Sequence, residues 1–190
     1  YDPDEIELLK GYLRNGGSLL VLLNPNPKSR LLELLNDWWI TAEDGIVIDE
    51  ESYVAPDKDT PLIPRTNNYL GLVETYFPGA TAIFPSGQLP EGVEPKFDED
   101  VDVEGSLALG VLVTAAFPDD VSGEPTETRL AVIGDSDFAA NQHFKNGNNS
   151  DLFLSTINWL TEGEEIISVD RKVLPTRRLI LDPEEERFLH

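Results

Sequence analysis

The densest group of reactive side chains follows an apolar run directly, in the segment Gly134-Asp135-Ser136-Asp137-Phe138. The run from Leu130 to Ile133 predicts a buried strand, so the turn after it would stand at a strand end, where open α/β sheets usually hold their ligands. A hydroxyl between two carboxylates suggests three roles: a nucleophile, a cation ligand set, or a helix cap.

A nucleophilic role for Ser136 would need a histidine base held by an acid. Serine hydrolases with a Gly-Asp-Ser turn place it near the start of the domain and add a downstream Asp-x-x-His. The histidines here are His143 and His190, and neither has an aspartate three residues before it. We therefore predict no serine hydrolase.

As cation ligands, Asp135 and Asp137 are two carboxylates where a hard cation wants several. The pattern favours a structural interpretation, in which Asp135 or Ser136 caps a helix entered at Asp137. Ligand or partner binding stays open as the alternative. The candidate residues, from this turn and from the Asn24–Pro27 loop after an earlier strand, are Asn24, Asn26, Asp135, Ser136, Asp137 and Asn141.

A second acidic group, residues 98–104, resembles a calcium loop. With Asp100 at position 1, Gly105 falls at the required position 6, but Val111 stands at position 12 where a bidentate glutamate belongs. We interpret this stretch as a solvated acidic loop, and the sequence predicts no metal and no cofactor.

The first elements that must position these residues are a helix and a strand. Asp2, Pro3 and Glu5 form a helix start, Gly16-Gly17 ends that helix, and the apolar run Ser18 to Leu23 predicts a strand buried on both faces. Because no strand precedes the helix, we expect the first strand of the sheet upstream of Tyr1.

Further on, the sequence predicts a helix from Ser29 to Trp38 with Trp38 and Trp39 as core and rim, then a strand over Gly45 to Ile48. Residues 49–105 form a loop-rich insertion, Ser106 to Phe117 predicts a strand antiparallel to Leu130–Ile133, and a final helix starts at Ser150 or Asp151 and stops at Gly163. Short extended pieces at 166–169 and 178–181 and an acidic tail follow. Asn148-Asn149-Ser150 also fits the N-glycosylation pattern.

Composition bounds the class of protein. The 190 residues fit one domain, and a net charge of −22 would repel nucleic acid. Cysteine is absent, which excludes disulfides, thiolate sites and a cysteine nucleophile. No run of about 18 apolar residues suits a membrane span.

The segments SLLVLLNP after Gly16-Gly17, VIGDSDFAAN, NSDLFLSTINWL, EEIISVDRK and RRLIL together resemble the uncharacterised ABC-type transport auxiliary family, also called the gliding-motility auxiliary type. That family resembles the GIFT domains of intraflagellar transport and, more distantly, class I glutamine amidotransferases in fold. The resemblance covers both ends of the chain and poorly covers residues 49–105.

The resemblance implies a single α/β domain, a flavodoxin-like or glutamine amidotransferase-like sandwich with a mixed, mostly parallel sheet and helices on both faces. It implies a membrane-anchored accessory subunit on the extracytoplasmic face, with residues 182–190 leading to a membrane span and an ABC permease and ATPase as partners. The amidotransferase nucleophile is a cysteine, which this chain lacks. We therefore expect no enzyme but a module that binds a protein or a surface polymer such as a glycan; the alternative is a hydrolase that acts on cell-surface material through acidic residues.

Overall fold

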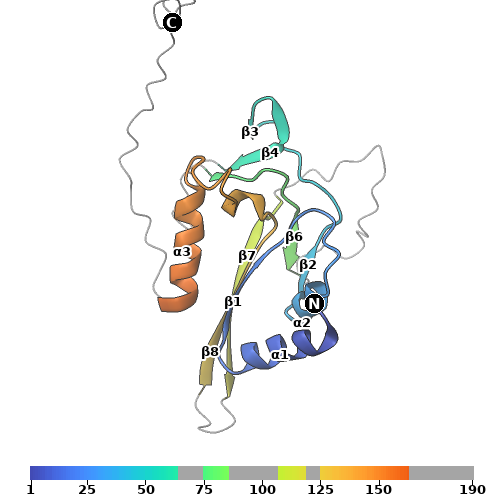
Figure 1. The fold of residues 1–190 in the computed structure, drawn as a ribbon, viewed down its shortest axis with the longest axis vertical. Coiled ribbons are helices and arrows are strands. Elements are labelled where there is room, and N and C mark those ends of the chain that lie inside the picture. The colour runs from blue at the N-terminus through green and yellow to red at the C-terminus, as the bar shows by residue number, and fades with distance from the viewer. Residues whose placement is uncertain (64–74, 86–106, 119–124, 163–190) are drawn as a thin grey trace, which may run out of the picture.

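The computed structural model describes residues 1–63, 75–85, 107–118 and 125–162. They form a mixed α/β fold with three small sheets (Figure 1). The acidic stretch 98–104, the extended pieces at 166–169 and 178–181, and the tail 182–190 lie outside the described residues.

The central sheet joins the two apolar strands that the sequence predicts. Strand β1 (Ser18–Leu22) pairs in parallel with β8 (Pro125–Ile133), with Leu22 opposite Ile133. Strand β7 (Gly110–Pro118) pairs with the other edge of β8 in the antiparallel sense, as predicted. The order is therefore β1-β8-β7.

The central sheet is mixed, as expected, but it is not mostly parallel among the described residues. Of the strand pairs in the described ranges, only β1 and β8 are parallel, and the others are antiparallel. The physical reason lies in the connections, because β7 and β8 follow each other along the chain as a hairpin, which forces the antiparallel sense.

Helix α1 (Pro3–Arg14) begins with the predicted capping box, in which the Asp2 side chain accepts from the Glu5 N–H and the Glu5 side chain accepts from the Asp2 N–H. Gly16 then adopts a φ of 81°, the left-handed conformation that ends helices and that glycine adopts without strain. The sequence thus predicts both ends of α1 correctly.

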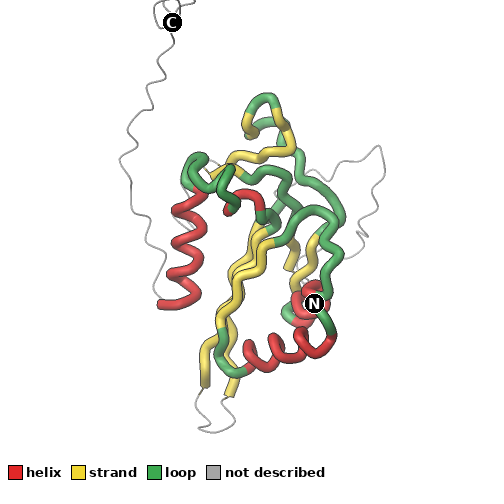
Figure 2. Tube along the Cα trace, in the orientation of Figure 1, coloured by secondary structure: helices red, strands yellow, loops and turns green. Residues whose placement is uncertain are grey.

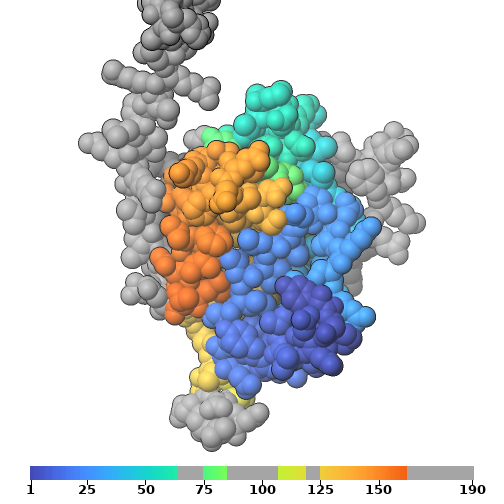
Figure 3. Space-filling view, in the orientation of Figure 1, coloured from blue at the N-terminus to red at the C-terminus, as the bar shows by residue number. Residues whose placement is uncertain are grey.

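Helices α2 (Leu31–Asp37) and α3 (Asn149–Glu162) lie on opposite sides of the central sheet in Figure 1. One core cluster joins Leu35 of α2 with Val21 and Leu130, and another joins Leu152 of α3 with Phe138 and Ile133. Alternation along the strands explains this division, because successive side chains of a strand point to opposite faces. Figure 3 shows blue β1 atoms on the near face, beside the orange α3.

The region after α2 differs from the prediction. The strand expected at Gly45 to Ile48 is absent, and Ile46 and Ile48 are 50% and 64% exposed. Strand β2 (Ile40–Ala42) lies earlier and pairs with β6 (Ile83–Pro85). Among the described residues, the apolar run at 45–48 pairs with no strand, and its backbone makes one hydrogen bond to the segment before β6, from Val47 N to Ala80 O.

Residues 49–105, expected to be rich in loops, contain regular structure where they are described. Strands β3 (Tyr53–Val54), β4 (Asp57–Ile63) and β5 (Thr75–Tyr76) form a small antiparallel sheet, visible beyond the end of the central sheet in Figures 1 and 2. Short strands with acidic and proline residues give weak periodicity, so the sequence pattern misses them.

Candidate functional site

The two loops with the predicted binding residues meet at one end of the central sheet. Asn24 follows β1 and Ser136 follows β8, and the parallel pairing brings both strand ends to the same edge. The Ser136 backbone N–H and its hydroxyl both donate to Oδ1 of Asn24, at 3.0 and 2.6 Å. The expectation that these loops share one edge of the sheet is confirmed. The two hydrogen bonds between Ser136 and Asn24 hold the loops together, so they have a structural role.

Asp135 is the capping residue of the turn. One carboxylate oxygen, Oδ1, accepts from the backbone N–H groups of Asp137 and Phe138, at 2.6 and 3.3 Å, where the short helix η1 (Asp137–Ala139) begins. Of the two capping candidates, Asp135 therefore fills the role, because the Ser136 hydroxyl is turned to Asn24.

The second carboxylate oxygen of Asp135, Oδ2, is buried without a hydrogen bond to the described residues, which is unusual for an acidic side chain. The residue as a whole is fully buried. Burial raises the pKa of the Asp135 carboxyl to about 7, against the opposing effect of the two N–H donors. Burial disfavours the charged form of a carboxyl, so Asp135 gains or loses its proton near neutral pH.

The remaining predicted site residues do not join this cluster. Asn26, Asp137 and Asn141 are exposed, and Asn26 has a positive φ of 55° in the loop after β1. Asn is one of the few residue types that adopts this conformation readily, which explains Asn26 without a ligand. A binding role for these three residues remains a prediction.

Asn149, which the sequence did not predict as a site residue, links three backbone segments near the turn by hydrogen bonds. It is fully buried; its Oδ1 accepts from Tyr76 N at 2.9 Å, and its Nδ2 donates to the carbonyls of Phe138 and His143 at 3.3 and 3.1 Å. Helix α3 starts at Asn149 rather than at Ser150 or Asp151. The sequence shows only the middle of a glycosylation triplet there, which gives no signal of burial.

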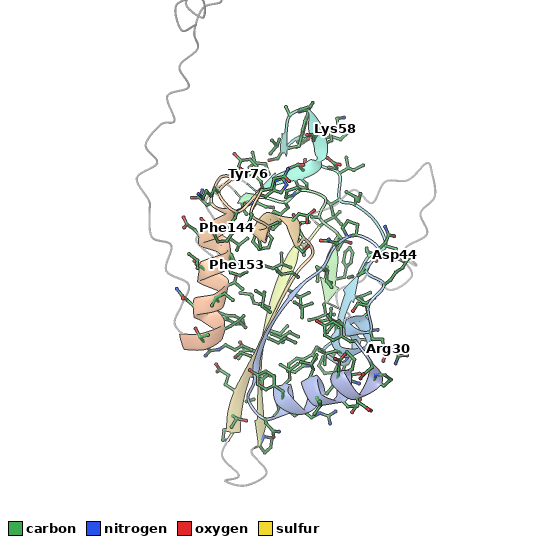
Figure 4. All side chains as sticks on the ribbon, in the orientation of Figure 1. Arg30, Asp44, Lys58, Tyr76, Phe144 and Phe153 are labelled. Atoms are coloured by element: carbon green, nitrogen blue, oxygen red, sulfur yellow. The ribbon has the colours of Figure 1, made fainter. Side chains whose placement is uncertain are left out.

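Two aromatic side chains pack together in the same region, between the turn and the start of α3. Phe144 and Phe153 stack edge to face with ring centroids 5.8 Å apart, and Figure 4 shows both near Tyr76 at the start of α3. The turn, η1 and the start of α3 therefore form one packed unit.

In the described part of this region, the side chains of Ser136 and His143 are hydrogen-bonded to asparagines rather than to each other. The Ser136 hydroxyl faces an amide oxygen, which cannot take up its proton, and His143 pairs with the exposed side chain of Asn146. Among the described residues, no group of three or more His, Cys, Asp or Glu side chains is placed to hold a metal ion.

No protein-family model matches the chain, and no curated protein sequence matches it. Among solved structures, the chain is similar to the N-terminal domain of mmIFT52, an intraflagellar transport protein, with a TM-score of 0.57 and 17% sequence identity. The similarity covers 84% of this chain and 72% of that chain. At this identity it shows the fold alone.

These comparisons correct the family assignment. The resemblance to the ABC-type transport auxiliary family is wrong, because no family model supports it and the structural neighbour is an intraflagellar transport domain. The predictions that depended on this family are therefore also unsupported. They are the role of an ABC transporter accessory subunit, the permease and ATPase partners, and the gliding-motility and amidotransferase-like descriptions. Nothing supports the alternative of a hydrolase that acts on surface material.

Within the described ranges, no helix has the length and apolar character needed to cross a bilayer. The expected location on the extracytoplasmic face stays a prediction.

Proposed function

We propose that this domain is a non-enzymatic protein-interaction module, on a framework related to the flavodoxin-like sandwich. The similarity to a domain of an intraflagellar transport protein supports an assembly role. The strand-end turn supports it indirectly, because Oδ1 of Asn24, the Ser136 hydroxyl and Oδ1 of Asp135 are hydrogen-bonded to one another or to the backbone.

The observation that carries the proposal is the conformation of Trp39. This residue is 73% exposed and has a φ of 55°, which a bulky side chain rarely adopts. Its neighbour Trp38 is partly buried in the core and packs edge to face on Phe117. The chain therefore presents one indole ring to solvent in a strained backbone position, and such outliers gather where a protein binds.

Trp39 suits an interface anchor in its chemistry as well. Tryptophan is enriched among the residues that contribute most to protein–protein binding. The acids Asp37 and Asp44 lie near it in the sequence, and the chain has a net charge of −22. We therefore expect a partner with an apolar pocket for the indole and basic residues around that pocket.

The test begins by capturing the partner with a photo-crosslinking amino acid at exposed Asn36, whose carbonyl oxygen accepts from Trp39 N, and at exposed Lys145 as a control position. Calorimetry on the purified pair then compares the wild-type chain with Trp39→Gly and with the control Leu154→Ala, which removes another exposed apolar side chain. We expect Trp39→Gly to weaken binding by roughly tenfold or more, and Leu154→Ala to leave it within about twofold.

Glycine is the informative substitution because it accepts a positive φ, so a loss of binding cannot come from added strain. Equal affinity of Trp39→Gly and the wild-type chain would refute the anchor. Turnover of a substrate by the purified domain would refute the non-enzymatic role.

A further inference from the structure

The chain contains two Asn-Gly pairs, Asn15-Gly16 and Asn146-Gly147. In such a pair, the backbone nitrogen of the glycine can attack the side-chain carbonyl carbon of the asparagine, Cγ, and displace the amide nitrogen. Glycine allows this attack more readily than other residues, because it has no Cβ to block the approach and its backbone is the least restricted. The reaction needs an exposed asparagine and a glycine N–H that is not held by a hydrogen bond. The two pairs differ in the second requirement.

The first pair is held in place at the end of α1. Asn15 is exposed, but the Gly16 N–H donates to Leu13 O at 3.2 Å. A Cβ built on Gly16 would lie 2.9 Å from Cβ of Thr126, so this glycine packs closely against β8. Before its nitrogen could attack Asn15, Gly16 would have to break its hydrogen bond and move away from the strand. The fold therefore protects this pair.

The second pair lies in the turn before α3. Asn146 and Gly147 are both exposed, and Gly147 has a φ of 49°, which glycine adopts without strain. Among the described residues, no hydrogen bond engages the Gly147 N–H. The nucleophile of this pair is therefore available, whereas the nucleophile of the first pair is not.

A histidine lies beside the group that this attack would displace. Nδ1 of His143 is 3.3 Å from Nδ2 of Asn146. When the Gly147 nitrogen adds to Cγ, Nδ2 changes from a planar amide nitrogen into an amine nitrogen, which accepts a proton. Imidazole is the side chain best suited to donate a proton near neutral pH, so His143 is placed to protonate Nδ2 as it departs.

We infer that Asn146 is a site of spontaneous covalent modification, which converts it to aspartate and isoaspartate with His143 as the general acid. The Gly147 nitrogen gives its proton to a hydroxide ion and bonds to Cγ. The Cγ–Nδ2 bond then breaks as Nδ2 takes a proton from His143 and leaves as ammonia. Water opens the cyclic imide at either carbonyl: opening at the backbone carbonyl of residue 146 gives isoaspartate, and opening at Cγ gives aspartate. The overall reaction consumes one water molecule and releases one ammonia molecule.

Isoaspartate at this position would disturb the start of α3. Asn146 O accepts from Asn149 N at 3.1 Å, and Asn149 Nδ2 donates to His143 O at 3.1 Å. In isoaspartate the main chain runs through Cβ and Cγ, so it gains one atom between these partners. The two hydrogen bonds cannot both keep their lengths in the longer chain. The modified turn should therefore hold the first turn of α3 less firmly.

In an unfolded chain the two pairs should react at similar rates, because each is an Asn-Gly pair that follows a basic residue, Arg14 or Lys145. The folded protein distinguishes them through the hydrogen bond of Gly16 and the contact of His143. Unfolded protein therefore provides a reference in which the difference should disappear. The modification does not depend on the proposed function, because it requires neither Trp39 nor a partner protein.

Peptide mass spectrometry tests the site. The purified full chain is incubated near neutral pH in water enriched in heavy oxygen, and samples are digested over time. Hydrolysis of the imide adds one heavy oxygen atom, and electron-based fragmentation separates isoaspartate from aspartate. We expect Asn146 to be modified roughly fivefold faster or more than Asn15 in the folded chain, since this is the factor that one hydrogen bond contributes. In urea the two rates should be nearly equal.

The variant His143→Gln tests the general acid. It keeps the backbone groups of residue 143 and removes the imidazole, so the modification of Asn146 should slow by roughly tenfold or more. The rate at Asn15 should stay as in the wild-type chain, which shows that the variant is folded. In urea the variant and the wild-type chain should modify Asn146 at the same rate, because the contact with His143 is lost in both.

Thermal unfolding tests the consequence for α3. The isoaspartate form, separated by chromatography, is compared with the variant Asn146→Asp, which carries the same added charge on an ordinary backbone. We expect the isoaspartate form to melt about 2 to 4 °C lower, the shift that corresponds to the loss of one hydrogen bond in a chain of this size.

Any of three results would overturn the inference. An Asn146 that stays intact in the folded chain while the unfolded chain is modified would show that the turn protects it. Modification of Asn15 as fast as that of Asn146 in the folded chain would show that the Gly16 hydrogen bond gives no protection. An unchanged rate at Asn146 in His143→Gln would show that the imidazole takes no part.

Discussion

Asn24 and Ser136, separated by 112 positions in the chain, are joined by two hydrogen bonds that tie the end of β1 to the end of β8. Both bonds end on the same atom, Oδ1 of Asn24, and come from the backbone N–H and the hydroxyl of Ser136. The pair thus continues the contact between the two parallel strands beyond their last register pair, since Asn24 lies two residues after Leu22 and Ser136 three residues after Ile133.

A double-mutant cycle on this pair should show coupling. Ser136→Ala removes only the hydroxyl bond, whereas Asn24→Ala removes both, so the second change should lower the free energy of unfolding more. Each bond contributes about 1 kcal/mol. Urea unfolding of the two single variants and the double variant should give a coupling energy of roughly 0.5 to 1 kcal/mol. Strictly additive effects would show that the two residues act independently.

The buried carboxyl of Asp135 should make stability depend on pH. Its pKa in the folded protein, about 7, lies above the ordinary value of 3.8, so the folded protein retains a proton that the unfolded chain releases. The stabilising contribution is therefore complete below about pH 4 and is lost as the pH rises through about 7, by about 4 kcal/mol in all.

Denaturant unfolding at several pH values measures this loss. Asp135→Asn keeps an acceptor oxygen for the Asp137 and Phe138 N–H groups but carries no charge, so the fall in stability over this pH window should largely disappear. The exposed control Asp44→Asn should retain the wild-type slope. A wild-type protein whose stability does not fall between pH 5 and pH 8 would contradict the assignment.

Asn149 should be among the most sensitive polar positions. Asn149→Ala deprives Tyr76 N and the carbonyls of Phe138 and His143 of a buried partner, and we expect a loss of about 3 kcal/mol or more. Asn149→Asp keeps the acceptor for Tyr76 but sets a carboxylate against two carbonyls, so it should also destabilise. Thermal unfolding measures both changes. Exposed Asn141→Ala, the control, should change stability by less than about 0.5 kcal/mol.

Gly134 is required because two backbone segments approach each other there. A Cβ at this position would lie 2.0 Å from the Thr81 carbonyl oxygen, and Thr81 N donates to Gly134 O at 2.6 Å. Gly134→Ala should therefore cost about 3 kcal/mol or more, or prevent folding. Gly45→Ala is the matched control, because its Cβ would meet nothing within 4 Å. Equal melting temperatures for the two variants would argue against the close approach.

The backbone strain at Trp39 has a measurable consequence for stability apart from binding. With φ at 55°, Trp39→Gly should be more stable than Trp39→Ala by about 1 kcal/mol, because an L side chain is disfavoured in this region and glycine is not. Both variants lack the indole, so lost side-chain contacts cancel in the comparison. Urea midpoints of the two proteins decide the matter, and the reverse order would indicate a relaxed backbone.

Local chemistry made several elements predictable. The capping box of Asp2 and Glu5, the glycine stop at Gly16, and the apolar runs of β1 and β8 act over a few residues, so their signals are complete in the sequence. The same holds for the cap at Asp135, one of two candidates that the sequence allowed.

The sequence by itself determined the two ends of α1, the strands β1 and β8 and the acidic, cysteine-free composition, because these depend on neighbouring residues and on simple counts. Only the tertiary structure decided that Asn24 would bond to Ser136, that Asn149 would be buried and accept from Tyr76 N, and that Trp39 would be exposed with a positive φ. Each of these depends on which distant segments meet, and hydrogen-bond partners far apart in the chain leave no periodic pattern along it.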